Sequence, residues 1–165
     1  MNLSLFSLEN KVAIVTGAGK GIGKSIALGL ADAGASVIVA ARTIADINAT
    51  AEEIKNKGVN SIAVPADVRV KDQVEPMVEA AVKEFGRIDI LVNNAGGTFN
   101  ASLVEMRENG WDAIFRENIK SVFLFTQAAS RVMIDQKAGN IINIVSWAGI
   151  SAFPQISLTA RPRRE

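Results

Sequence analysis

The fold of this chain is decided by Thr16-Gly17-Ala18-Gly19-Lys20-Gly21-Ile22-Gly23, a stretch with the pattern Thr-Gly-x-x-x-Gly-x-Gly. It follows Lys11 to Val15, a short apolar run rich in β-branched residues that predicts a buried strand. It leads into Gly21 to Ala33, where apolar residues recur with helical spacing. Glycines at such a junction let the chain turn sharply and bring the first N–H groups of the helix close to an anion. The stretch therefore predicts a loop that binds phosphate.

Strand and helix patterns alternate along the rest of the chain, as is typical of right-handed βαβ units. The predicted strands are Ser36 to Ala41, Ser61 to Val64, Ile88 to Val92 and Ile141 to Val145, and the predicted helices are Thr43 to Lys57, Lys71 to Phe85 and Gly110 to Asp135. We therefore expect an α/β fold with a doubly wound parallel sheet, the Rossmann fold, as a single domain over residues 1–165.

The composition is that of a soluble globular protein. Of its 165 residues 48% are apolar, and 18 basic side chains against 17 acidic ones leave a net charge of +1. This balance gives no reason to expect binding to nucleic acid or to an anionic membrane. No apolar run reaches the roughly 18 residues of a spanning helix, and the N-terminus lacks the features of a signal peptide, so we expect a cytoplasmic protein. The sequence has no Cys, His or Tyr, so no metal site is expected and histidine is excluded from any mechanism.

The end of the second predicted strand indicates which dinucleotide is preferred. In NAD-binding proteins, an acidic residue roughly 20 positions after the glycines binds the ribose 2′-hydroxyl. Here that place holds Ala41 followed by Arg42, and Lys20 lies within the glycine stretch. Two cations suit the additional 2′-phosphate of NADP. We therefore predict NADP as the cofactor, with NAD less favoured and with solvated surface charges as the alternative interpretation of both cations.

Further residues, taken together with the glycine stretch, resemble the classical short-chain dehydrogenase/reductase family: Asp67-Val68, Asn93-Asn94-Ala95-Gly96, Asn118 and Ser146. The resemblance implies that Asp67 binds the adenine amino group, that Val68 lies against the adenine ring, and that Asn94, Ala95 and Gly96 lie beside the adenosine ribose. Asn118 would interrupt the last helix and hold a water molecule in a proton relay, and Ser146 would donate a hydrogen bond to the substrate carbonyl. A turn cap, a solvated helix residue and a strand end are the ordinary alternatives for Asp67, Asn118 and Ser146.

The resemblance also implies a reaction, in which hydride moves between nicotinamide and a small carbonyl or alcohol substrate. In the family a tyrosine transfers the proton, and a lysine four residues later lowers the pKa of that tyrosine. The corresponding positions here hold Thr159 and Arg163. A threonine hydroxyl is a much weaker acid than a phenol. We therefore expect a fold that is incomplete at its C-terminus, truncated before the Tyr-x-x-x-Lys motif, and a chain that is inactive as it stands.

The residues after Leu158 suggest how this departure arose. One back-translation of Thr159-Ala-Arg-Pro-Arg-Arg-Glu165, read in the neighbouring frame, gives Tyr-Gly-Ala-Ala-Lys-Ala-Gly, with tyrosine at position 159 and lysine at position 163. We interpret this as a single-base deletion, with a natural tail as the alternative. Three functions stay open: an NADP-dependent reductase or dehydrogenase, a binding module without turnover, and a nonfunctional product of a frameshifted gene.

Truncation at this point has a physical consequence. Without the family's next helix, an apolar face of the sheet and of the helix Gly110 to Asp135 is expected to meet solvent, and the fifth strand is expected to lie unprotected at the sheet edge. By the resemblance, the full-length parent is a homo-oligomer that uses this helix as its contact. We therefore expect the 165-residue chain alone to be poorly soluble or partly molten.

Overall fold

The computed structural model describes residues 3–98, 101–102 and 104–147. Its centre is a parallel sheet of five strands in the order β3-β2-β1-β4-β5. The strands are β1 (Val12–Thr16), β2 (Ser36–Ala41), β3 (Ser61–Pro65), β4 (Ile90–Asn93) and β5 (Asn140–Asn143). The order of strands reverses between β1 and β4, so the sheet is doubly wound, as the sequence predicts.

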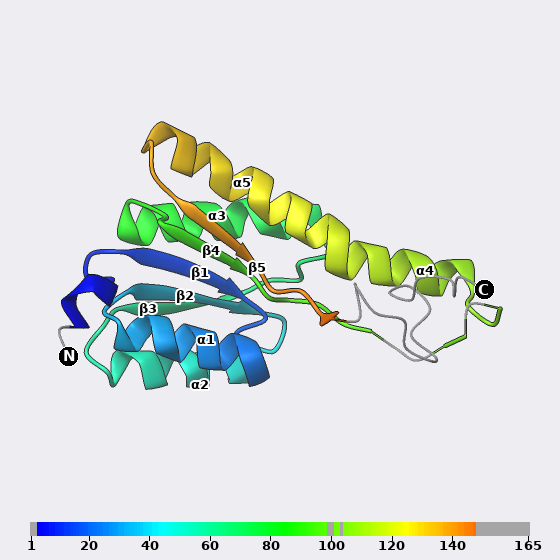
Figure 1. Cartoon of the computed structure of the whole chain (residues 1–165), viewed down its shortest axis with the longest axis horizontal. Coiled ribbons are helices and arrows are strands. Elements are labelled where there is room, and N and C mark those ends of the chain that lie inside the picture. The colour runs from blue at the N-terminus through cyan, green and yellow to red at the C-terminus, as the bar shows by residue number, and fades with distance from the viewer. Residues whose placement is uncertain (1–2, 99–100, 103, 148–165) are drawn as a thin grey trace.

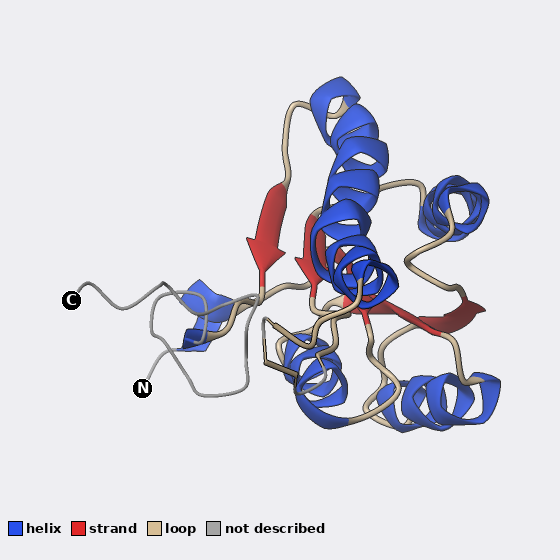
Figure 2. Cartoon of the chain, turned by 90° about the vertical axis from the view of Figure 1, so that its right-hand side faces the viewer, coloured by secondary structure: helices blue, strands red, loops and turns tan. Residues whose placement is uncertain are grey.

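Helices cover both faces of the sheet. On one face lie α1 (Gly21–Asp32) and α2 (Ile44–Lys55), and on the other lie α3 (Lys71–Phe85) and α5 (Ser121–Asp135) (Figure 1). The helix α4 (Glu108–Phe115) continues the line of α5 beyond the sheet, and the 3-10 helix η1 (Leu3–Phe6) precedes β1. Figure 2, turned by 90°, shows the strands between the two layers of helices. The architecture is a three-layer α/β sandwich.

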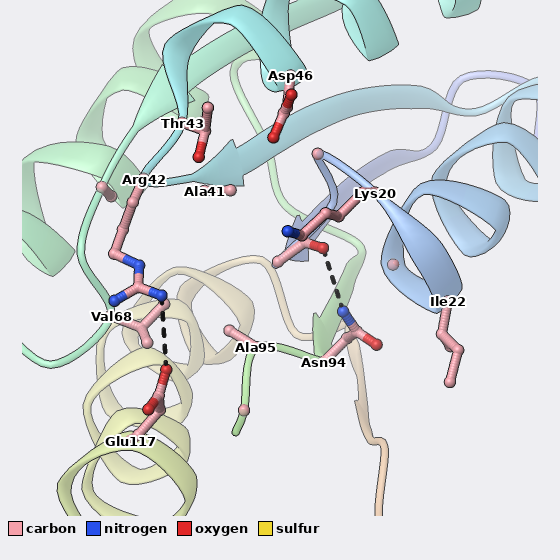
Figure 3. Close-up of a pocket in the computed structure, with 15 residues that line it drawn as sticks. Lys20, Ile22, Ala41, Arg42, Thr43, Asp46, Val68, Asn94, Ala95 and Glu117 are labelled. Atoms are coloured by element: carbon pink, nitrogen blue, oxygen red, sulfur yellow. Dashed lines mark hydrogen bonds and ion pairs between the residues drawn. The ribbon is translucent and has the colours of Figure 1, made fainter. Parts of the chain in front are cut away.

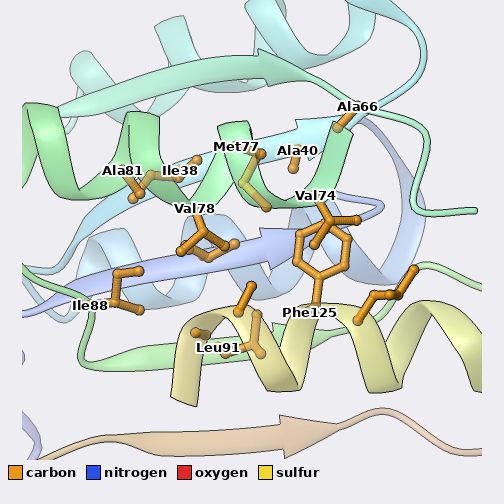
Figure 4. Packing of buried hydrophobic residues seen from close by; sticks show 14 of the residues in the cluster. Ile38, Ala40, Ala66, Val74, Met77, Val78, Ala81, Ile88, Leu91 and Phe125 are labelled. Atoms are coloured by element: carbon orange, nitrogen blue, oxygen red, sulfur yellow. The ribbon is translucent and has the colours of Figure 1, made fainter. Parts of the chain in front are cut away.

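The double cover explains why the inner strands are almost continuously apolar. All five residues of β1 are buried, and so are the four central residues of β2. On the face of α3 and α5, Phe125 is 1% exposed and belongs to the same core cluster as Val74, Met77 and Leu91 (Figure 4). A second cluster, beneath α1 and α2, contains the small side chains of Ala27 and Ala31, together with larger ones from α2.

Most predicted ranges agree with the structure to within two or three residues, and those of β2 and α3 agree at both ends. The predicted helix Gly110 to Asp135 begins instead at Glu108 and is divided by η2 (Arg116–Lys120), a π-helical segment. The fifth strand ends at Asn143 rather than at Val145, because its pairing partner β4 ends at Asn93, which is in register with Asn143.

Apolar side chains are exposed along α4, η2 and α5. Phe115, Ile119 and Phe123 follow one another at intervals of four residues and are 43%, 60% and 56% exposed; we refer to these three as the apolar stripe. In the described sheet β5 is an edge strand, and Ile142 on it is also exposed. Both exposures agree with the expectation from the sequence. None of the helices that the structure describes is long and apolar enough to cross a membrane.

Candidate functional site

A pocket of about 330 Å³ opens at the carboxyl ends of the strands, beside the N-terminus of α1 (Figure 3). It lies where the strand order reverses, which is where ligands bind in doubly wound folds. Its lining comes from the glycine stretch, the segments that follow β2, β3 and β4, and η2: Gly17, Gly19, Lys20, Ile22, Gly23, Ala41, Arg42, Thr43, Asp46, Ala66, Val68, Asn94, Ala95, Gly96 and Glu117. Five segments distant in sequence therefore meet at one cavity.

The glycine stretch is tightly folded, as Gly23 and Gly17 show most clearly. A Cβ atom added to Gly23 would lie 2.3 Å from the carbonyl oxygen of Gly17 and 2.4 Å from Nδ2 of Asn94. Gly17 has a φ of +67°, a left-handed conformation that L side chains rarely adopt. The glycines of the sequence pattern are thus required by a close approach of the backbone and by a sharp turn.

The N-terminus of α1 is open toward an anion. Lys20 occupies the N-cap position with extended backbone, and no side chain caps the helix there. The first turn carries no acidic residue. Ile22 lines the pocket from this turn with its side chain 67% exposed. Uncapped N–H groups at a helix start carry partial positive charge and bind phosphate groups. These residues fit the pyrophosphate of a dinucleotide.

Thr16 joins the glycine stretch to the end of β4. Its hydroxyl donates a hydrogen bond to the carbonyl of Val92 at 3.2 Å and accepts from the N–H groups of Asn94 and Ala95, both at 3.0 Å. Asn94 Nδ2 donates in return to the Thr16 carbonyl at 2.9 Å. Thr16 is 1% exposed, and neither it nor Gly21 lines the pocket. Thr16 therefore fixes the two segments that line the pocket rather than forming its wall.

Four charged side chains line the pocket. Lys20 and Arg42 are the predicted cations, and the structure adds two acids, Asp46 and Glu117. The Nη2 atom of Arg42 lies 3.9 Å from Oε1 of Glu117 (Figure 3). Sequence reasoning missed both acids. Asp46 follows Arg42 by four residues, in the first turn of α2, which is a usable local signal, whereas Glu117 lies in the remote η2 and no local pattern places it there.

Of the two residues after β3 that the resemblance places against adenine, one lines the pocket and the other does not. Val68 is 7% exposed and lines the pocket, as the predicted adenine contact requires. Asp67 lies outside the lining, and its carboxylate accepts two parallel hydrogen bonds from Arg69, at 2.9 Å from Nε to Oδ1 and 2.6 Å from Nη2 to Oδ2. This hydrogen bonding lowers the pKa of Asp67 below its usual value although partial burial opposes it. The Asp67 carboxylate is thus ionised, and both of its oxygens already accept hydrogen bonds from Arg69.

Asn118 lies in η2, where it marks the predicted interruption of the long helix. Its Oδ1 accepts from the N–H of Gly97 at 3.0 Å, and its Nδ2 donates to the carbonyls of Gly97 at 2.8 Å and Ile114 at 2.9 Å. Both amide hydrogens are used, so Oδ1 keeps one lone pair for a further donor such as water. The structure therefore joins Asn118 to the segment after β4, next to Gly96.

Ser146 lies three residues beyond the end of β5 and is exposed. Asn93, at the end of β4, donates a hydrogen bond from Nδ2 to Oδ1 of Asn143 at 2.9 Å, which fixes the end of β5 at the same edge of the sheet. Thr159 and Arg163, the positions at which the resemblance places the tyrosine and the lysine, lie outside the described residues.

Comparison with known proteins gives this geometry a context. The sequence profile of the short chain dehydrogenase family matches residues 11–158. A 3-oxoacyl-[acyl-carrier-protein] reductase from Staphylococcus epidermidis is 44% identical over 146 residues, which is 88% of this chain and 60% of the relative. A 2-dehydro-3-deoxy-D-gluconate 5-dehydrogenase from Escherichia coli is 44% identical over 147 residues, 88% of this chain and 57% of the relative. The chain thus spans about 60% of the length of these curated relatives.

Solved structures resemble the fold closely. A short-chain type dehydrogenase/reductase from Mycobacterium marinum superposes with a TM-score of 0.90 and 40% identity, over 95% of this chain and 65% of the other. A 7α-hydroxysteroid dehydrogenase in complex with NADH and 7-oxoglycochenodeoxycholic acid superposes with a TM-score of 0.92 and 32% identity, over 97% of this chain and 62% of the other. Solved members of this family therefore share this arrangement of strands and helices.

Proposed function

Because the chain belongs to the short-chain dehydrogenase family, we propose that its pocket binds NADP and that the parent activity is hydride transfer between the nicotinamide and a carbonyl or alcohol carbon of a small molecule. One observation carries the proposal. The tight approach of Gly23 to Gly17 lies at an uncapped helix start, where backbone N–H groups are available to a pyrophosphate. NADP, when bound, supplies or accepts the hydride.

The assignment of the other residues follows from their places in the pocket. Val68 forms an apolar wall suited to adenine, and the backbone after β4, including Gly96, lies where a ribose binds. Lys20 and Arg42 are the two cations available to a 2′-phosphate, and Ala41 leaves the end of β2 without the acid that a ribose 2′-hydroxyl needs in NAD-binding relatives of this fold. These features support NADP over NAD.

The residues proposed for the chemistry are Ser146 and Asn118. The Ser146 hydroxyl donates a hydrogen bond to the substrate carbonyl oxygen, which stabilises negative charge there as the hydride arrives. Asn118 holds a water molecule through the lone pair that its Oδ1 keeps. A homo-oligomer that uses the apolar stripe of α4 to α5 completes the proposal for the full-length parent.

A second candidate is binding without turnover, including the case of a frameshifted gene product. The observation that favours it is the presence of Thr159 and Arg163 where a proton-transferring tyrosine and its lysine are expected, in a sequence without any tyrosine. In this case the pocket binds NADP, and no proton donor of suitable acidity accompanies it.

Calorimetric titration of the 165-residue chain with NADP⁺ and NAD⁺ tests the binding proposal. We expect NADP⁺ to bind more tightly, and Arg42→Gln to weaken NADP⁺ by about tenfold while leaving NAD⁺ within about twofold, as for removal of one cation from a phosphate contact. Equal affinities for both dinucleotides, unchanged in Arg42→Gln, would contradict the assignment of Arg42.

NADPH oxidation with a panel of ketones and 3-oxoacyl thioesters then separates the two candidates. The unaltered 165-residue chain and its double variant Thr159→Tyr/Arg163→Lys are compared at matched protein and cofactor concentrations. Turnover that appears only in the double variant supports the parent reductase activity and explains the inactivity of the chain as it stands. Tight NADP⁺ binding with no turnover in either protein favours the binding module.

A further inference from the structure

The pocket contains an acid that faces its phosphate-binding cation. Glu117 projects from η2, whereas Arg42 follows β2, and the two side chains point toward each other (Figure 3). Their charged atoms, Arg42 Nη2 and Glu117 Oε1, are 3.9 Å apart. The side chain of Arg42 is 58% exposed and that of Glu117 only 25%. The acid is therefore the more enclosed partner, and the cation is the one that solvent or a ligand reaches.

The backbone beside Glu117 leaves room for its carboxylate. A Cβ atom added to Gly97 would lie 3.1 Å from Oε2 of Glu117, so the glycine leaves room for the carboxylate. Gly97 is itself fixed by two hydrogen bonds to Asn118. The Asp67–Arg69 pair adds one more charge of each sign nearby. Positive and negative charges are thus balanced at the end of the pocket that is proposed to bind adenosine, whereas a typical site for an anion carries positive charges alone.

We infer that Glu117 is a specificity-determining residue, whose carboxylate competes with the cofactor's 2′-phosphate for Arg42 and so reduces the preference for NADP over NAD. This inference rests on the proposed function, because it concerns the same pocket. A phosphate monoester carries about −1.5 to −2 charges at neutral pH. To approach Arg42 it must displace or neighbour the Glu117 carboxylate, whereas a ribose 2′-hydroxyl meets no such repulsion.

The expected magnitude is set by the exposure of the pair. A partly exposed ion pair changes an equilibrium by up to about fivefold, and salt screens it. Because the phosphate carries more than one charge, removal of the Glu117 charge should tighten NADP⁺ binding by about three- to tenfold. NAD⁺ has no group at this position that interacts with the carboxylate charge, so its affinity should change by less than about twofold.

Glu117→Gln is the appropriate variant because it keeps the size of the side chain and removes its charge. The fold should tolerate the change. The hydrogen bond that Ser121 Oγ donates to residue 117 uses the backbone carbonyl and not the side chain. Glu84→Gln is the matched control, because it removes the same charge from an exposed residue near the far end of α3, outside the pocket lining.

Calorimetric titrations with NADP⁺ and NAD⁺ at about 0.05 M and about 0.5 M salt measure the effect, with 2′,5′-ADP and 5′-AMP as smaller probes of the same contrast. In Glu117→Gln we expect the affinity to rise for NADP⁺ and 2′,5′-ADP and to stay unchanged for NAD⁺ and 5′-AMP. This rise in affinity should be smaller at high salt and absent in Glu84→Gln. No change, or a loss of NADP⁺ affinity, would overturn the inference, because Glu117 would then be neutral or would position Arg42 for the phosphate. A loss of NAD⁺ affinity without a gain for NADP⁺ would also overturn it, since the carboxylate would then bind the ribose hydroxyl.

The same titrations distinguish failure of this inference from failure of the proposed function. If the unaltered chain binds neither dinucleotide, the proposed function fails and the inference fails with it. If the unaltered chain binds NADP⁺ and the ratio of NADP⁺ to NAD⁺ affinity is the same in Glu117→Gln, only the inference fails.

Discussion

Replacing Gly23 by alanine adds one methyl group at the tightest point of the site. The new Cβ atom would start 2.3 Å from the Gly17 carbonyl oxygen, and real Cβ atoms essentially never approach closer than 3.0 Å, so the Gly17 backbone must move by about 0.7 Å. This movement is resisted because Asn94 Nδ2, the second clashing atom at 2.4 Å, is held by the Thr16 carbonyl. Forced overpacking of this kind costs about 1–3 kcal/mol of folding free energy.

The chain offers a matched control in the same helix. Gly29 lies in α1, is exposed, and has no atom within 4 Å of the position of an added Cβ. Gly29→Ala should therefore raise the free energy of unfolding by about 0.5–1 kcal/mol, through helix propensity alone. Two changes of the same size in one helix are thus expected to have opposite signs.

Thermal unfolding followed by circular dichroism, with NADP⁺ titration of each variant, checks the prediction. For a chain of this size each kcal/mol shifts the melting temperature by about 2–4 °C, so Gly23→Ala should melt about 5 °C lower and Gly29→Ala slightly higher than the parent. Displacement of the loop should also weaken NADP⁺ binding by at least about tenfold in Gly23→Ala. If Gly23→Ala had the melting temperature and the NADP⁺ affinity of the unaltered chain, the close approach of Gly17 and Gly23 would be refuted.

Two further predictions concern the buried acid Asp89 and the apolar stripe. Asp89 is 6% exposed and accepts hydrogen bonds from Arg87 and from the N–H of Val12. Burial acts to raise the pKa of Asp89, but these bonds and the positive charges of Arg87 and Lys11 together outweigh burial and lower it. Because the folded pKa lies below the unfolded one, this stabilisation is present above about pH 4 and is lost as the pH falls through the folded pKa. Asp89→Asn should lower the free energy of unfolding by about 1–3 kcal/mol at pH 7. Urea titrations at decreasing pH should show that the difference between the variant and the unaltered chain shrinks below about pH 4. A difference that stays constant with pH would contradict the lowered pKa of Asp89. The double variant Ile119→Gln/Phe123→Gln removes two members of the apolar stripe and should reduce self-association of the chain, measured by light scattering on a sizing column. Little stability should be lost, because both side chains are already exposed. An unchanged molar mass distribution would contradict the role of the apolar stripe as a contact between copies of the chain.

Much of the fold was predictable because the signals are local. The β2 strand and the α3 helix have the predicted bounds, since each is set by a run of apolar residues and by turn residues next to it. The glycine stretch predicted its own turn, and the φ of Gly17 and the crowding at Gly23 explain why. Lys20 and Arg42 were placed at the pocket by one rule, that the carboxyl ends of parallel strands meet at one edge of the sheet, and Val68 was placed there by the family resemblance.

The features that the sequence did not predict depend on contacts between distant segments. Asp67 follows β3 as predicted, but its carboxylate binds Arg69, two residues later, and Asp67 does not line the pocket. The fifth strand is shorter than its apolar run because β4, its partner, ends first. Register and side-chain pairing are decided between elements, and periodicity within one element carries no information about them.

The η2 segment shows how one such feature connects two parts of the site. A π-helical turn accommodates one extra residue within a continuous helix and is often found at functional sites. Here it presents two consecutive residues to one glycine: Asn118 binds the backbone of Gly97, and Glu117 occupies the space that a side chain on Gly97 would need. From this place Glu117 also reaches Arg42, beyond the end of β2. A shift of η2 by one residue would move both contacts together. If the proposed function holds, the geometry of η2 couples the position of Asn118 to the charge that the 2′-phosphate of NADP would meet, and substitutions that straighten this segment should alter cofactor preference and turnover together.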